Sequence, residues 1–163
     1  MKNSALVEQS PARRSTRSLL PVQTASQPEI AHRLRAIEEA AVVQSIGGTP
    51  LVRLRTLERH LGLPASIELH LKTEWVNPGG SIKDRTALSI VRAAVASNDL
   101  KPAQRLIDAT SGNTGIAYAM LGAALGIPVT LVVPDSASLE RKTTLAAYGA
   151  EVVFSDPYEG SDG

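Results

Sequence analysis

Short apolar segments alternate with helical segments through the second half of the chain, and this alternation limits the folds that it can adopt. Mostly apolar, strand-like runs occupy residues 106–109, 128–133 and 151–154, and helical patterns at 115–125 and 139–148 separate them. Strands that alternate with helices of this length form βαβ units, in which the strands are parallel and helices cover the sheet. We therefore predict an α/β fold with an open, mostly parallel sheet and helices on both faces.

The first half of the chain contains further candidate elements. Apolar residues recur at helical spacing over 30–41 and again over about 81–96, whereas 51–54 and 67–72 have strand patterns. Residues 1–28 hold three prolines, several Ser and Thr and three arginines, without a sustained apolar period. We interpret residues 1–28 as a flexible N-terminal extension and 29–163 as the α/β region. An Arg- and Ser-rich transit peptide is the alternative, which Glu8 and the prolines disfavour.

Composition excludes several classes of function. Seventeen basic and sixteen acidic residues leave a net charge of +1, and aromatic residues make up 3%, so no nucleic-acid partner is expected. The chain contains no cysteine, which excludes disulfides, a thiolate nucleophile and Cys-ligated metals. The three histidines share no metal-ligand spacing, and no metal site is expected. Because no positive n-region precedes an apolar h-region, we expect a cytoplasmic protein.

A stretch without charges between Asp108 and Asp135 is long enough to resemble a membrane span. Gly122, Gly126 and Pro128 interrupt it where a buried helix would end and a buried strand would start. Two elements of a globular core explain the stretch better than a membrane helix does. No membrane partner is therefore expected.

The segment from Asn77 to Arg85 (Asn-Pro-Gly-Gly-Ser-Ile-Lys-Asp-Arg) is the most specific candidate for a catalytic motif. Ser81 suits a helix N-cap and Asp84 its capping-box partner, which places Lys83 in the first helical turn. The positive end of a helix disfavours a cation by about 0.3–1 kcal/mol, and burial disfavours it further. Lys83 is therefore a candidate neutral nucleophile for Schiff-base chemistry. The alternative, which local sequence alone favours, is an ordinary surface lysine.

A second candidate loop, Thr110-Ser111-Gly112-Asn113-Thr114-Gly115, lies between a predicted strand and a predicted helix. Its small and hydroxylated residues offer backbone N–H groups, hydroxyls and an amide at a helix start, which suits a carboxylate or a phosphate. In open α/β sheets, ligands bind at the carboxyl ends of the strands, where this loop is expected. A capping loop without a ligand is the alternative.

Together the two segments resemble the signature segments of fold-type II pyridoxal-phosphate enzymes, the group of cysteine synthase and cystathionine β-synthase. The likeness extends from Ile46-Gly47-Gly48-Thr49-Pro50-Leu51 through Ser138-Leu139-Glu140-Arg141 to the end of the chain. The order and distance of the two segments make the resemblance specific.

The resemblance implies a role for each matching residue. Lys83 would hold pyridoxal 5'-phosphate as an internal aldimine and later move the substrate Cα proton. Asn113 would bind the pyridoxal ring hydroxyl, and Thr110, Ser111 and Thr114 would bind the substrate carboxylate. The implied reaction is β-replacement, in which O-acetylserine loses acetate and sulfide adds to give L-cysteine. Because members usually dimerise, a homodimer is the implied assembly.

Family members also have a second half, with a Gly-rich loop for the cofactor phosphate, and this chain matches only their N-terminal part. Two alternatives therefore stay open. One is a cystathionine β-synthase-like enzyme, although its haem-binding kind would need a cysteine. The other is a truncated, non-catalytic α/β fragment.

Overall fold

The computed structural model describes residues 25–110, 112–156 and 158, and the predicted extension lies outside them except for residues 25–28. The helices are α1 (Gln27–Glu39), α2 (Ala41–Gln44), α3 (Arg55–His60), the 3-10 turn η1 (Glu74–Val76), α4 (Lys83–Ala96), α5 (Asn113–Leu125) and α6 (Leu139–Ala147). The strands are β1 (Leu51–Arg53), β2 (His70–Lys72), β3 (Leu106–Ala109), β4 (Val129–Pro134) and β5 (Glu151–Ser155).

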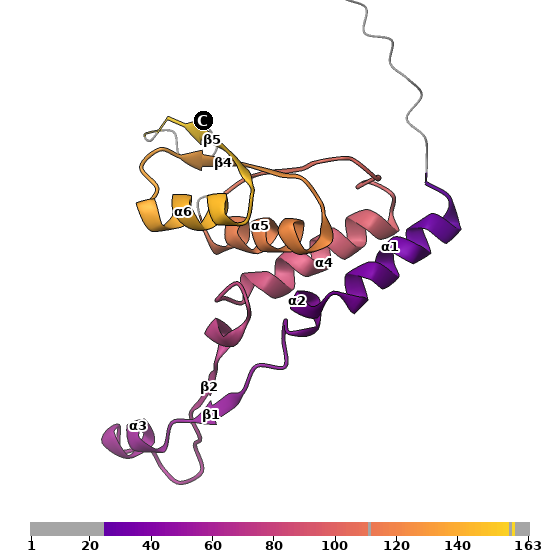
Figure 1. Cartoon of the computed structure of the whole chain (residues 1–163). Coiled ribbons are helices and arrows are strands. Elements are labelled where there is room, and N and C mark those ends of the chain that lie inside the picture. Colours follow the sequence, from indigo (N-terminus) through magenta and orange to yellow (C-terminus); the bar gives the residue numbers. More distant parts are fainter. Residues whose placement is uncertain (1–24, 111, 157, 159–163) are drawn as a thin grey trace, which may run out of the picture.

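The predicted parallel α/β sheet is confirmed. Strands β3, β4 and β5 lie in that order and run parallel, with Asp108 beside Leu131 and Leu131 beside Val152. Helix α5 lies between this sheet and α4 (Figure 1). A helix in that position is covered on opposite sides, which explains why α5 is apolar nearly all round. The core extends from this layer to α1, α2 and α6.

Helices α5 and α6 pack on the same face of the sheet, the face that carries the fully buried Leu131. Both crossovers move in one direction across the sheet, and right-handed crossovers then place their helices on one side. The opposite face leaves Ile107 68% exposed and Val153 46% exposed. Within the described residues, helices therefore cover one face of the sheet, whereas we predicted helices on both.

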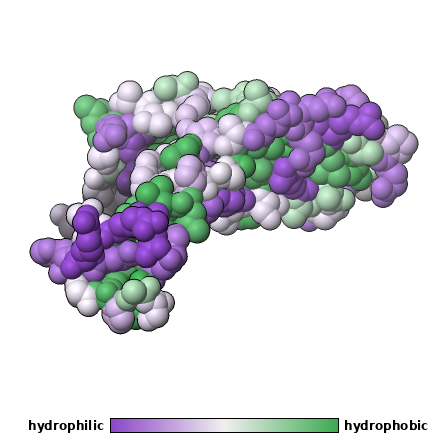
Figure 2. Space-filling model, turned by 90° about the horizontal axis from the view of Figure 1, so that it is seen from below, coloured by the Kyte–Doolittle hydropathy of each residue, from purple (hydrophilic) through white to green (hydrophobic). Residues whose placement is uncertain are grey.

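Residues 51–72 form a projecting arm (Figure 1) that consists of β1, α3 and β2. Its strands are antiparallel, with Val52 opposite Leu71. The carboxylate of Glu58 accepts hydrogen bonds from Arg53 Nε and from the backbone N–H of Leu69, and these bonds lower the pKa of Glu58. Hydrophobic and strongly hydrophilic patches lie side by side on the arm, which is nearest the viewer in Figure 2.

Several predicted boundaries differ from the observed ones. Helix α1 begins at Gln27, so residues 27–28 belong to a helix and not to the expected extension. Strand β2 covers only the last three residues of the predicted 67–72. The charge-free stretch does contain two elements, since α5 ends at a left-handed Gly126 and β4 follows. Among the described residues, no helix has both the length and the apolar character that a membrane span requires.

Candidate active site

The turn before α4 presents Lys83 as the first residue of that helix. Gly80 adopts φ +81°, a conformation that glycine tolerates best, and its N–H donates to the Asn77 carbonyl at 2.8 Å. The Ser81 hydroxyl accepts a hydrogen bond from the Lys83 N–H at 3.2 Å. The helix thus begins two residues later than predicted, with Ile82 in the N-cap position. The prediction that Lys83 occupies a first helical turn is confirmed.

Asp84 does not form the predicted capping box with Ser81. Its carboxylate instead accepts a hydrogen bond from the backbone N–H of Gly79 at 2.5 Å. The side chain is completely buried, and burial raises the pKa of Asp84 while the Gly79 hydrogen bond lowers it. The turn therefore folds back onto the start of α4 through this carboxyl group.

Lys83 itself is exposed in the described structure, so the expected burial of its amine is not found. An exposed amine at this position is accessible to an aldehyde from solvent. None of the described residues buries this side chain.

Glu74 ties the turn to the segment before β1. Its carboxylate accepts hydrogen bonds from Arg85 Nε at 3.0 Å, Thr49 Oγ1 at 3.0 Å and Asn77 Nδ2 at 2.8 Å. Asn77 Oδ1 in turn accepts from the Gly47 N–H at 2.9 Å. These donors, Arg85 first, lower the pKa of Glu74 to about 2. The carboxylate is therefore ionised at neutral pH. It links the segment before β1, the turn at Asn77 and the first turn of α4.

The loop after β3 leads directly into α5, whose first residue is Asn113. The Thr110 N–H donates to the Val132 carbonyl at 3.0 Å, which extends the sheet by one residue. Thr110 Oγ1 accepts a long hydrogen bond of 3.4 Å from the Gly112 N–H. A Cβ on Gly115 would lie 3.0 Å from Thr110 Cγ2, so Gly115 allows this close contact. Ser111, the remaining predicted carboxylate ligand, lies outside the described residues.

Two further predicted ligands stand in the first turn of α5. The side chain of Asn113 is exposed and that of Thr114 is half-buried. The N–H groups in the first turn of a helix lack intrahelical acceptors, and those of Asn113 and Thr114 have no acceptor among the described residues. N–H groups without an acceptor among the described residues, at the positive end of a 13-residue helix, suit an anion.

The lysine and the loop meet at one end of the fold. Helices α4 and α5 pack side by side and begin at the same end, the end at which β3 and β4 finish (Figure 1). Asn113 also lines a pocket of about 140 Å³ between the first turns of α5 and α6, with Ser138 and Arg141. The arrangement therefore offers an amine, an amide and helix-end N–H donors at a single edge.

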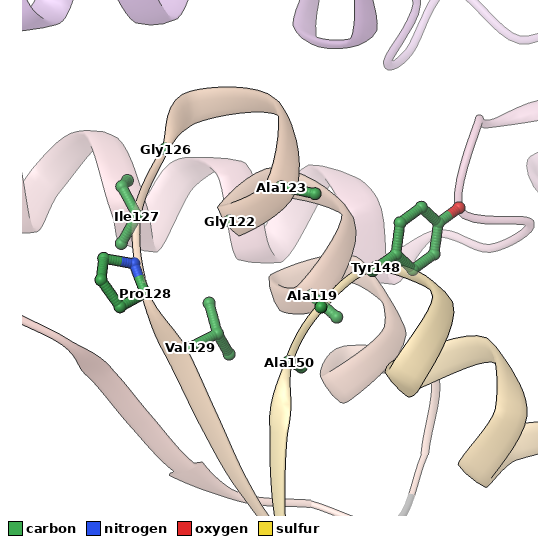
Figure 3. Close-up of a pocket in the computed structure, with 10 residues that line it drawn as sticks. Ala119, Gly122, Ala123, Gly126, Ile127, Pro128, Val129, Tyr148 and Ala150 are labelled. Atoms are coloured by element: carbon green, nitrogen blue, oxygen red, sulfur yellow. The ribbon is translucent and has the colours of Figure 1, made fainter.

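A larger pocket of about 310 Å³ lies at the opposite end of α5, between its last turn and the start of β4 (Figure 3). Small and apolar residues line it, among them Ala119, Gly122 and Ala150. It contains none of the predicted site residues. No three potential metal ligands come together among the residues that the structure describes.

The chain belongs to the family of pyridoxal-phosphate dependent enzymes, because the model of that family matches residues 42–162. The resemblance inferred from the Lys83 segment and the Thr110 loop is thus confirmed. Within the family, the chain is 48% identical to the cysteine synthase of Aquifex aeolicus over 122 residues, which are 75% of this chain and 37% of that protein. It is 42% identical to cysteine synthase B of Pseudomonas aeruginosa over 127 residues, 78% of this chain and 41% of that one.

Comparison with solved structures also finds similarity to cysteine synthase and to a related synthase. The crystal structure of the cysteine synthase of Entamoeba histolytica matches with a TM-score of 0.72 at 31% identity, covering 98% of this chain and 40% of that one. That of O-ureido-L-serine synthase matches with a TM-score of 0.68 at 42% identity, covering 75% of this chain and 37% of that one. The chain therefore spans about two fifths of the length of these relatives.

Glu74, Thr49 and the Gly47 N–H were not predicted as part of the site. Glu74 and Arg85 are eleven residues apart and Thr49 is more distant still, so no local periodicity connects them. The available signal was the pair of glycines at 47 and 48 directly before a Thr-Pro, which marks a constrained backbone. Gly47 has φ +90° and Gly48 has φ +58°.

Proposed function

We propose that the protein containing this chain uses pyridoxal 5'-phosphate to make L-cysteine from O-acetylserine and sulfide. One observation carries the proposal: Lys83 and Asn113 open two adjacent helices that begin at the same edge of the fold. The identity of 42–48% to proteins named cysteine synthase supports the choice of reaction. Because the chain spans about two fifths of those relatives, the activity is that of the whole protein.

The donor set of this chain fits the cofactor and the substrate. The exposed primary amine of Lys83 can condense with an aldehyde, and the Asn113 amide can donate to a ring hydroxyl oxygen. The hydroxyls of Thr110, Ser111 and Thr114 and the N–H groups of the first turn of α5 can hold a substrate carboxylate. When bound, the cofactor supplies an electron sink for the negative charge that develops at the substrate Cα.

The residues of the chain then orient the substrate and move its proton. A carboxylate held by the first turn of α5 would lie at the edge of the fold where α4 also begins. Lys83 Nζ, once free, accepts the Cα proton and later returns it. In the net reaction the Cβ–O bond to acetyl breaks, acetate leaves with the electron pair, and sulfide forms the Cβ–S bond.

The test titrates the full chain with pyridoxal phosphate, follows the imine absorbance and traps the adduct by borohydride reduction. We expect the reduced adduct on the peptide that contains Lys83, and its loss in Lys83→Ala. Lys101→Ala, which changes a lysine in the loop before β3, should keep the adduct. An adduct that persists in Lys83→Ala would contradict the assignment of the lysine.

Sulfide-dependent release of cysteine from O-acetylserine, compared with homocysteine as the nucleophile, separates this reaction from its main rival. The rival is favoured by a solved O-acetylserine dependent cystathionine beta-synthase from Helicobacter pylori, which matches at 30% identity with a TM-score of 0.68. A cytoplasmic homodimer belongs to the same proposal, and cell fractionation and sedimentation of the purified protein test it.

A further inference from the structure

Asp84 is a buried carboxyl group to which the proposed reaction assigns no role. Its side chain is 0% exposed, and Oδ2 accepts the hydrogen bond from the Gly79 N–H. Oδ1 is also buried and has no hydrogen-bond partner among the described residues. A polar group buried in this way costs free energy, so packing alone would be served better by an apolar side chain.

The backbone of Gly79 lies directly against this carboxyl group. A Cβ added at Gly79 would come within 3 Å of three carboxyl atoms of Asp84. Gly79 does not have a positive φ, so backbone conformation does not require a glycine there. The close approach of Asp84 is therefore the physical reason for glycine at this position.

The hydrogen bond from the Gly79 N–H to the Asp84 carboxyl, here called the clamp, joins the turn that precedes Lys83 to the residue that follows Lys83. The Glu74 carboxylate and Asn77 fix the start of this turn, and the Gly80 N–H closes it onto the Asn77 carbonyl. The Asp84 carboxyl fixes the middle of the turn to the first turn of α4. Since Lys83 precedes Asp84 directly, the direction in which Lys83 leaves the helix depends on that contact.

We propose that Asp84 is a positioning residue for Lys83: its buried carboxyl clamps the Gly79 N–H and thereby sets where the amine at the start of α4 is presented. The inference rests on the proposed function of Lys83. It assigns Asp84 no contact with the cofactor or the substrate.

The experiment compares Asp84→Ala, which removes the acceptor, with Asp84→Asn, which keeps an acceptor oxygen of the same reach. The first measurement is hydrogen exchange at the Gly79 amide, and the second is the rate at which pyridoxal phosphate forms a reducible adduct on Lys83. In Asp84→Ala, we expect exchange to be about tenfold faster and adduct formation about tenfold slower, as for the loss of one hydrogen bond to a buried carboxyl. Asp84→Asn should restore both rates to near the parent values.

A second variant repeats the comparison without emptying the buried site. Gly79→Ala should push the carboxyl away and slow adduct formation to a similar degree, but it should add no further slowing when combined with Asp84→Ala. Equal slowing by Gly79→Ala in both backgrounds would overturn the proposal, and so would an Asp84→Asn variant as slow as Asp84→Ala. The thermal unfolding midpoint of each variant identifies effects of global stability.

The two proposals can fail separately. A parent chain that forms no adduct on Lys83 would contradict the proposed function. A Gly79 amide that exchanges equally fast in the parent and in Asp84→Ala would contradict the clamp alone.

Discussion

Replacing Gly122 by alanine tests how closely α5 packs against β4. A Cβ at this position would lie within 3 Å of Val129 Cγ2 and of the Ile127 carbonyl oxygen. Neither atom can move freely. Val129 is buried in the core, and the Ile127 N–H is bonded to the Gly122 carbonyl at 3.0 Å.

The magnitude follows from two opposing effects. Overpacking of a core costs about 1–3 kcal/mol. Alanine regains about 0.5–1 kcal/mol over glycine within a helix. Because one of the two clashes is with the backbone, we expect the free energy of unfolding to fall by a net ~1–2 kcal/mol.

Urea and thermal unfolding, followed by circular dichroism, measure this change. For a chain of this size, each kcal/mol lowers the thermal midpoint by about 2–4 °C. Ala123→Gly, at the exposed neighbouring position, is the matched control and should cost only the helix propensity of about 1 kcal/mol. If Gly122→Ala instead raised the midpoint, as helix propensity alone requires, the described contact between α5 and β4 would be refuted.

Two further changes test the site and the core. The pKa of Glu74 lies at about 2 in the folded chain against an ordinary value of 4.5, so its stabilising contribution is complete above pH 4.5 and is lost as the pH falls towards 2. The difference in thermal midpoint between the parent and Glu74→Gln should therefore shrink over that interval, and a constant difference would contradict the role of the charge. Leu131→Ala empties a fully buried site in the central strand and should lower the free energy of unfolding by about 2–5 kcal/mol in urea titrations. A loss well below 1 kcal/mol would show that the sheet is not packed as described.

The sequence patterns predicted the parallel sheet well because each of its elements carries a strong local signal. Strand β3 has the predicted bounds, and β4 and β5 differ from theirs by one residue. Helix α3 was missed because residues 55–60 have no apolar stripe. Its position depends on Glu58, which bonds Arg53 and Leu69 across the arm. Contacts between segments distant in sequence leave no periodic pattern.

At the candidate site, too, local sequence predicted some features and left others undetermined. The position of Lys83 in a first helical turn followed from the turn residues that precede it. The partner of Asp84 did not, because a carboxyl at this position can reach either the Ser81 N–H or the Gly79 N–H, and only the folded turn decides between them. The exposure of Lys83 depends on what surrounds the first turn of α4, and local sequence carries no signal of that.

One face of the sheet, on which Ile107 and Val153 lie, is covered by no described helix, and this limits where a further parallel strand could be added. A right-handed connection that leaves β5 and places its helix over Ile107 and Val153 must end in a strand beside β3, on the side away from β4. The direction of winding would then reverse next to β3, and such reversal points open a crevice at the carboxyl ends of the strands. The Thr110 loop leaves β3 at that edge. Chirality alone would thus place the Thr110 loop at the mouth of the crevice that a doubly wound sheet would form.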